Sequence, residues 1–213
     1  MPTIYVASLS DYNAGTLHGA HIDAAQEPDA IYAEIKAMLD ASPEFRAFPA
    51  GGPAEEWAIH DYEGFGPWRL SEYQSIETVS LVARAIEEFG DDDAAGIVGG
   101  YISAYSFDQF TDYYDDVDGF VDLVRSHYRG NWSSFKDYVT SFDYYFGPLE
   151  ALRNYAQAAT QYGTDAEKEN ANEAVDHLNG YIDWDLVARE AEMEGYTTVS
   201  ADTGGIHIFE DEV

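Results

Sequence analysis

The residues of this sequence that could do chemistry are carboxylates, and they crowd into one stretch that has no Lys or Arg between Arg84 and Arg125. If residues 107–124 are largely helical, four aspartates fall near one face, because residues three and four apart are neighbours there. Like charges at that spacing weaken a helix by a few tenths of a kcal/mol per pair, so we expect the chain to use the negative surface itself. The four aspartates are Asp108, Asp112, Asp115 and Asp116. The whole acidic segment comprises Glu87, Glu88, Asp91, Asp92, Asp93, Asp108, Asp112, Asp115, Asp116, Asp118 and Asp122.

The spacing of these carboxylates does not fit a dedicated metal site. An EF-hand loop needs Gly at its sixth position and Glu at its twelfth. With Gly119 at position six, position twelve is Arg125, and with Gly96 at position six it is Ile102. The His-Glu-x-x-His zinc motif is absent as well. The sequence therefore predicts no metal and no cofactor, although weak, nonspecific binding of divalent cations to the acidic face stays open.

Motifs of catalysis are also missing. There is no Cys, no Gly-x-Ser-x-Gly elbow, no P-loop and no Gly-x-Gly-x-x-Gly. A glycosidase-like pair of carboxylates would be hidden among the 41 acidic residues. We predict that the protein is not an enzyme, and an enzyme with such a hidden pair is the third alternative.

The composition describes a folded acidic protein. Hydrophobic residues make up 46% of the chain and aromatic residues 15%, which a disordered acidic tail would lack. The formal net charge of -31 disfavours direct binding of nucleic acid. The N-terminus lacks a basic region followed by a long apolar run, and no stretch approaches the roughly 18 apolar residues of a membrane span. We predict a cytoplasmic protein.

The amount of charge is comparable with that of DNA. Duplex DNA carries one negative charge per ~1.7 Å of axis, so this net charge corresponds to ~53 Å of duplex. A compact globule of this chain length would be roughly 44 Å across. The comparison permits mimicry of DNA. A surface that is acidic for solubility alone gives the same composition, so composition does not separate the two.

Periodicity and turn residues predict an α+β chain. Strands are expected over 3–9, 16–23 and 57–62, with a turn at 11–15 and a helix from Pro28 to Asp40. A helix capped by Ser75 should end at Gly90, and a second helix, weakened by glycines, should follow from Asp93. Further helices are predicted over 149–161, 166–178 and 183–194, the last with Leu186, Val187 and Met193 inward, before a hairpin of 197–199 and 206–209.

Breaks at Gly66 and near Tyr105 divide this pattern into domains. We predict an N-terminal α+β domain over 1–66, a central helical domain over 67–105 and a C-terminal α+β domain over 106–213. Short antiparallel sheets are expected at both ends of the chain. The tyrosines fit either the core or an interface. The core or its boundary is predicted for Tyr73, Tyr101, Tyr113 and Tyr155.

Several motifs point to one family. The run from Trp57 to Glu63, which contains Ala-Ile-His-Asp-Tyr-Glu, is followed by Ser-Glu-Tyr-Gln-Ser-Ile-Glu at 71–77. Five further motifs match the same family, in order along the chain. They are Ile-Tyr-Val-Ala at 4–7, Tyr-Asn-Ala-Gly at 12–15, Leu-Asn-Gly-Tyr-Ile-Asp-Trp-Asp at 178–185, Ala-Arg-Glu at 188–190 and Gly-Ile-His-Ile-Phe at 205–209. With these motifs the chain resembles the ArdA-type antirestriction proteins. Residues 146–176 do not match the pattern and look like an insertion.

The resemblance implies an elongated, acidic homodimer that mimics bent B-form DNA. Such proteins are carried by mobile elements and occupy the DNA-binding groove of Type I restriction-modification enzymes. The family's antirestriction motif corresponds to residues 178–190 and implies a dimer contact there, with Tyr181, Ile182 and Trp184 as candidates. Core packing is the alternative role for these three. The alternative function is that of an acidic interaction protein that binds another basic DNA-binding partner, such as a nucleoid protein.

Overall fold

The computed structural model of the protein describes residues 1–47, 52, 54–105, 110–141 and 147–211. They form two compact units. The first holds Met1–Tyr128 with Val199–Thr203, and the second holds Arg129–Thr198 with the described residues from Gly204 on. Helices and two small antiparallel sheets near the chain ends confirm the predicted α+β class. The predicted division at residues 66 and 105 remains a proposal.

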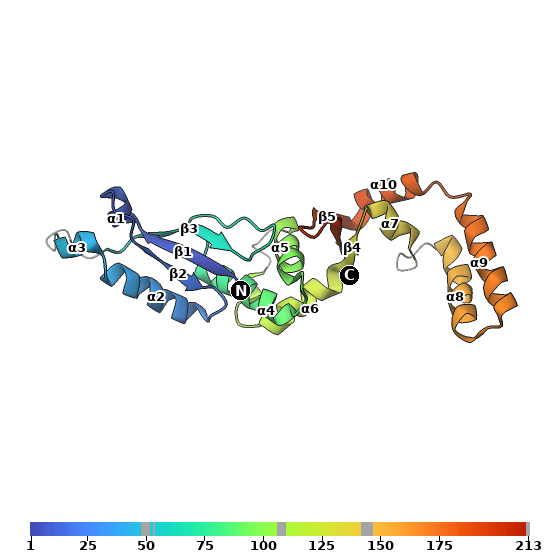
Figure 1. Ribbon diagram of the computed structural model, residues 1–213, viewed down its shortest axis with the longest axis horizontal. Coiled ribbons are helices and arrows are strands. Elements are labelled where there is room, and N and C mark those ends of the chain that lie inside the picture. Colours follow the sequence, from blue (N-terminus) through green and yellow to red (C-terminus); the bar gives the residue numbers. More distant parts are fainter. Residues whose placement is uncertain (48–51, 53, 106–109, 142–146, 212–213) are drawn as a thin grey trace. The chain divides into compact units, whose positions relative to one another are not determined.

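A three-stranded sheet opens the first unit. Its strands β1 (Thr3–Ser8), β2 (Gly19–Asp23) and β3 (Trp57–Glu63) lie in the order β2-β1-β3, and β1 pairs antiparallel with both neighbours. Helix α2 (Pro28–Asp40) lies along one face of this sheet (Figure 1). It buries the apolar stripe that its sequence predicts, namely Ile31, Ile35, Met38 and Leu39.

The connection between β1 and β2 differs from the predicted turn. Residues Leu9–Asn13 form a short helix, α1, capped by the side chain of Ser8. Its Asp11 is buried, and Oδ1 accepts hydrogen bonds from Ser42 Oγ and from the backbone N–H of Glu44, both at 2.9 Å. These bonds join α1 to α3 (Pro43–Ala47), which follows α2. The helix α1 is thus stabilised by hydrogen bonds between Asp11 and residues about thirty positions away. The sequence around Asp11 predicted only a turn.

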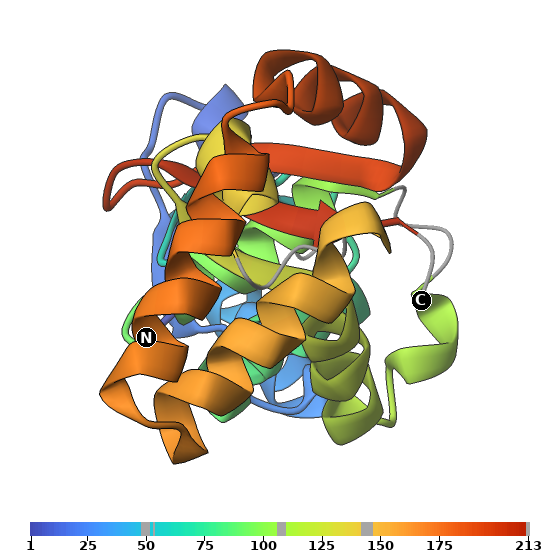
Figure 2. The ribbon, with the colours of Figure 1, turned by 90° about the vertical axis from the view of Figure 1, so that its right-hand side faces the viewer.

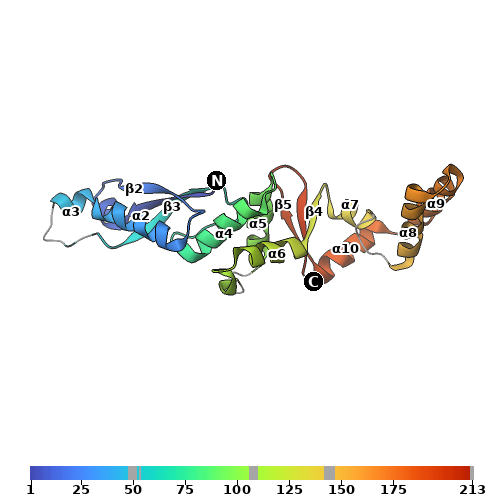
Figure 3. The ribbon, with the colours of Figure 1, turned by 90° about the horizontal axis from the view of Figure 1, so that it is seen from below.

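Helices complete the first unit. Helix α4 (Ile76–Phe89) begins after its Ser75 cap and ends at Gly90, which has a φ of 69°, as predicted. Helix α5 (Ala94–Ala104) is buried along most of its length despite its glycines. A Cβ on Gly99 would lie 2.1 Å from the carbonyl oxygen of Phe65, so glycine allows this close approach. Helix α6 (Val117–His127), preceded by the 3-10 turn η3 (Thr111–Tyr113), packs against α4 (Figure 3).

The second sheet has the strand order β4-β6-β5. Strands β5 (Tyr196–Ser200) and β6 (Ile206–Glu210) form the predicted closing pair. Strand β4 (Tyr128–Trp132) was not predicted, because it contains Gly130 and Asn131, two residue types that are uncommon in strands. Gly130 has a φ of 106°, which glycine adopts without strain, and the strand passes through it.

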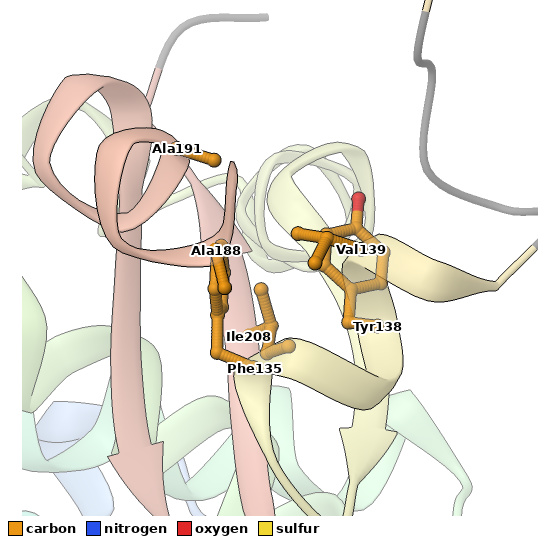
Figure 4. Packing of buried hydrophobic residues seen from close by; sticks show 6 residues of the cluster. All are labelled: Phe135, Tyr138, Val139, Ala188, Ala191 and Ile208. Carbon is orange, nitrogen blue, oxygen red and sulfur yellow. The ribbon is translucent and has the colours of Figure 1, made fainter. Parts of the chain in front are cut away.

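The core of the second unit lies between this sheet and two helices. Helices α7 (Phe135–Thr140) and α10 (Trp184–Gly195) bring together the six buried residues in Figure 4: Phe135, Tyr138, Val139, Ala188, Ala191 and Ile208. The predicted inward positions of α10 are wrong for Leu186 and Met193, which are 43% and 78% exposed. Val187 does pack on the core. The inward stripe follows the 3.6-residue period from Trp184 through Ala188 to Ala191, which places Leu186 and Met193 on the opposite face.

Helices α8 (Gly147–Tyr162) and α9 (Asp165–Asn179) lie side by side as a hairpin, in agreement with the two predicted helices (Figure 2). Their contact is a small core of Ala156, Ala159, Ala171 and Val175. Thr164 caps α9 in a capping box with Glu167. Within the described ranges, no helix is long and apolar enough to cross a membrane.

The predicted tyrosines divide between core and surface. Tyr101 is only 3% exposed and Tyr113 is half-buried, which agrees with the prediction. The prediction is wrong for Tyr73, which is 73% exposed, and for Tyr155, which is also exposed.

Candidate functional site

The acidic segment lies in the first unit, over the end of α4, the turn into α5, and the start of α6. Asp93 is half-buried, and its Oδ2 accepts a hydrogen bond from Thr203 Oγ1 at 3.0 Å. Asp108 lies outside the described residues. The other members are all exposed: Glu87, Glu88, Asp91, Asp92, Asp112, Asp115, Asp116, Asp118 and Asp122.

The expected single helix over 107–124 does not form in the described part of this range. Asp112 lies in the 3-10 turn, Asp115 follows it, and α6 begins only at Val117. Asp116 is the N-cap of α6, and its Oδ1 accepts a hydrogen bond from the backbone N–H of Gly119 at 2.9 Å. The side chain thus satisfies one of the free N–H groups at the helix start, which favours a boundary here over a continuous helix.

Arg125 connects the two acidic helices. From α6, its Nη2 donates to the carbonyl oxygen of Phe89 at 3.3 Å, and its guanidinium lies 5.1 Å from the centre of the Phe89 ring. Its Nη1 is 3.6 Å from Asp122 Oδ1. Phe89 is the last residue of α4, where a positive charge is favourable because the helix carbonyls are unpaired there. Arg125 therefore holds α6 to the end of α4, and the acidic residues of the two helices lie on neighbouring elements.

The electrostatic effect of the acidic turn extends to Tyr128. Burial, together with the charges of Asp93 and Asp91, raises the pKa of Tyr128 to about 12. Both carboxylates oppose ionisation of the Tyr128 phenol, which shows that the acidic turn makes the electrostatic potential at Tyr128 negative.

A second acidic row on α9 was missed by the sequence reasoning. The row consists of the exposed residues Asp165, Glu169, Glu173 and Asp176. At about 100° per residue they share one face of the helix, opposite Ala171 and Val175 of the hairpin core. The spacing of these four acids, which are four, four and three residues apart, was the signal in the sequence that could have identified the row.

The three candidates for the dimer contact have different surroundings. Tyr181 is 77% exposed and Ile182 is half-buried. Trp184 packs on the second core, its Nε1 donates to the carbonyl oxygen of Asn179 at 3.2 Å, and the guanidinium of Arg153 lies 5.5 Å from its ring. The contacts of Trp184 are those of a packing residue, and the dimer role of all three remains a proposal.

The outward face of α10 carries a symmetric set of exposed residues. Leu186 and Met193 lie two turns apart, with Arg189 and Glu190 between them. The four positions are symmetric about the midpoint of Arg189 and Glu190. An antiparallel copy of the helix would therefore place an apolar residue against an apolar one and a basic residue against an acidic one.

Metal ligands do not gather anywhere in the described ranges, because no group of three or more His, Asp or Glu side chains is placed to hold an ion. Fold and surface together define an acidic α+β protein whose exposed functional groups are mainly carboxylates. The family model described as "Antirestriction protein (ArdA)" matches residues 4–205, so the chain belongs to the ArdA antirestriction family. A search of the curated proteins finds no match.

Proposed function

We propose that this antirestriction protein blocks the DNA-binding groove of Type I restriction-modification enzymes, with carboxylates in the positions of DNA phosphates. The observation that carries the proposal is the exposed acidic segment. Among the exposed, described members of the segment, Asp122 alone forms an ion pair, with Arg125, so most of these exposed carboxylates can meet the Lys and Arg residues of a partner. The family match supports the antirestriction role.

The proposed mechanism needs no catalytic group. Each exposed pair of charges contributes under ~1 kcal/mol, so inhibition depends on many weak contacts and not on one residue. The negative field steers the inhibitor to the positively charged groove and makes association sensitive to salt. In this proposal the protein is a non-enzymatic inhibitor that acts in the cytoplasm and is encoded by a mobile element.

The α9 row, in the second unit, is proposed as a further acidic surface for the same kind of basic groove. Successive carboxylates one turn apart are ~6 Å from each other along the helix axis. This distance is a little under twice the ~3.4 Å axial spacing of phosphates on one DNA strand.

The proposal includes a homodimer. The outward face of α10 supports it, because antiparallel pairing with a second copy sets Leu186 against the Met193 of that copy and Arg189 against its Glu190. Two opposite-charge pairs at this contact would offset part of the repulsion between two chains of net charge -31. The predicted contacts of Tyr181 and Ile182 lie just before this helix.

The test is a competition assay with a purified Type I methyltransferase bound to a labelled duplex. The protein should displace the duplex at a near-stoichiometric amount, and displacement should weaken as salt rises. No displacement at high excess across several such enzymes would reject the proposal. Tight, salt-sensitive binding to a nucleoid protein in that case would favour the alternative, an acidic interaction protein that binds another basic DNA-binding partner.

A further inference from the structure

The face of the first sheet that α2 leaves uncovered has an unusual composition. In the strand register, Tyr5 lies opposite His21 on β2 and opposite Asp61 on β3. One pair further along, Thr3 lies opposite Asp23 and Glu63. Residues directly opposite in antiparallel strands share a face, and the alternate residues Ile4 and Ile22 are buried on the other face. The uncovered face therefore presents Tyr5 with carboxylates beside it.

The face of the sheet that α2 leaves uncovered has a small hollow beside Tyr5. A hollow of about 50 Å³ is lined by Thr3, Tyr5, His21, Asp61, Tyr62 and Glu63. A water molecule takes up about 30 Å³ in the liquid, so the hollow accepts one small head group and no cofactor. The His21 ring supports the Tyr5 ring from one side, with centroids 4.8 Å apart and the rings tilted by 48°.

The carboxylates at the hollow are available for a ligand. Asp61 and Glu63 are exposed, and Asp61 Oδ1 accepts a hydrogen bond from the backbone N–H of Tyr62 at 2.9 Å. Across the described ranges, neither carboxylate forms an ion pair with a basic side chain of the chain itself. The hollow thus combines an aromatic ring with two carboxylates whose charge the protein does not neutralise.

We infer that this hollow binds the guanidinium of an arginine side chain supplied by a partner protein. A guanidinium is attracted to the face of a tyrosine ring and donates paired hydrogen bonds to carboxylates. It is also planar and less strongly hydrated than an ammonium group, which favours arginine over lysine beside an aromatic ring. The inference rests on the proposed function only for the source of the arginine, which is the basic groove of the target. Unlike the acidic segment, the hollow would make a contact with a defined direction.

The test is a titration of the full chain, labelled with ¹⁵N, with N-acetyl-L-arginine amide at constant ionic strength. The amide signals of Tyr5, His21 and Asp61 should shift to saturation. The D61N/E63Q variant should bind roughly tenfold more weakly, because it loses two pairs worth up to ~1 kcal/mol each. The D29N/E34Q variant is the matched control: it loses the same charge from exposed positions of α2, on the other face of the sheet, and should bind as the unmodified protein does.

Three results would overturn the inference. The first is a linear, unsaturated shift spread over the amides of α4 and α6. The second is unchanged binding by the D61N/E63Q variant, with the dispersion of its spectrum showing that it is folded. The third is binding of the neutral citrulline amide, or of the lysine amide, as tight as that of the arginine amide. None of these results involves a methyltransferase, so a failed displacement assay and a failed arginine titration are distinguishable.

Discussion

The guanidinium of Arg125 lies against the last residue of α4, with its Nη2 3.3 Å from the carbonyl oxygen of Phe89. This contact joins two acidic helices in a region that has few basic residues. We predict that R125M, which keeps much of the side-chain volume, lowers the free energy of unfolding by about 1 kcal/mol, through loss of the helix-end and ring contacts. Urea denaturation measures the change. K36M removes the same charge from an exposed pair on α2 and should change stability little; equal effects of the two variants would contradict the role of Arg125.

Neutralising several carboxylates of the acidic segment should weaken inhibition cumulatively. We expect the variant D112N/D115N/D118N/D122N to inhibit a Type I enzyme roughly ten- to hundredfold less well, since each contact contributes under ~1 kcal/mol. Its displacement of duplex should also depend less steeply on salt. Each single substitution should have little effect. If one of them alone abolished inhibition, distributed mimicry would be wrong.

Asp116 is left out of that set because it has a structural role. Its carboxylate caps α6, so D116A should lower the free energy of unfolding by about 1 kcal/mol. D115A removes the neighbouring exposed carboxylate and serves as the control, with a change within about 0.5 kcal/mol. Thermal unfolding of both variants distinguishes the cap from its neighbour, and equal melting temperatures would contradict the assignment of the cap.

Asp11 should make stability depend on pH. Burial raises the pKa of Asp11, but hydrogen bonds from Ser8, from the N–H of Glu44 and from Ser42, together with the charge of His18, hold it below the ordinary 3.8. A lowered pKa in the folded state means that the folded protein favours the ionised form. This contribution is fully present above pH 3.8 and is lost as the pH falls through the lower folded-state pKa.

Comparison with D11N isolates that contribution. We expect D11N to be less stable than the unmodified protein at pH 7, with a difference that shrinks as the pH falls below 3.8. Chemical denaturation over a series of pH values measures it. A difference that stays constant down to pH 2 would show that the ionised carboxylate is not what stabilises the contact between α1 and α3.

The proposed α10 contact predicts a charge-reversal result. R189E should weaken self-association, because it sets two acidic residues against each other across the two-fold axis. The double variant R189E/E190R should restore it, since it exchanges the charges and keeps their pairing. Sedimentation equilibrium measures the dissociation constants. K36E makes the same charge change on α2 and should leave association unchanged, and failure of the double variant to recover would argue against this contact.

Local signals in the sequence were sufficient for much of the fold. Pro28 and the apolar stripe predicted α2, and the Ser75 cap with Gly90 predicted α4, because caps and periodicity act within a few residues. The motifs of the sequence indicated the ArdA antirestriction family, and the family match over residues 4–205 confirms that assignment. Composition alone established the sign and the amount of the charge.

Other features depend on partners distant in the sequence. Leu186 and Met193 face outward because the alanines of α10 fit against Phe135 and Ile208. Strand β4 forms because β6, about eighty residues away, pairs with it. The hollow at Tyr5 needs the register of three strands, which sets His21 and Asp61 on either side of it. The sequence by itself determined the charge, the family and the helices with strong local signals. Tertiary structure decided which side chains face one another, since strand register and core packing depend on contacts that no local pattern contains.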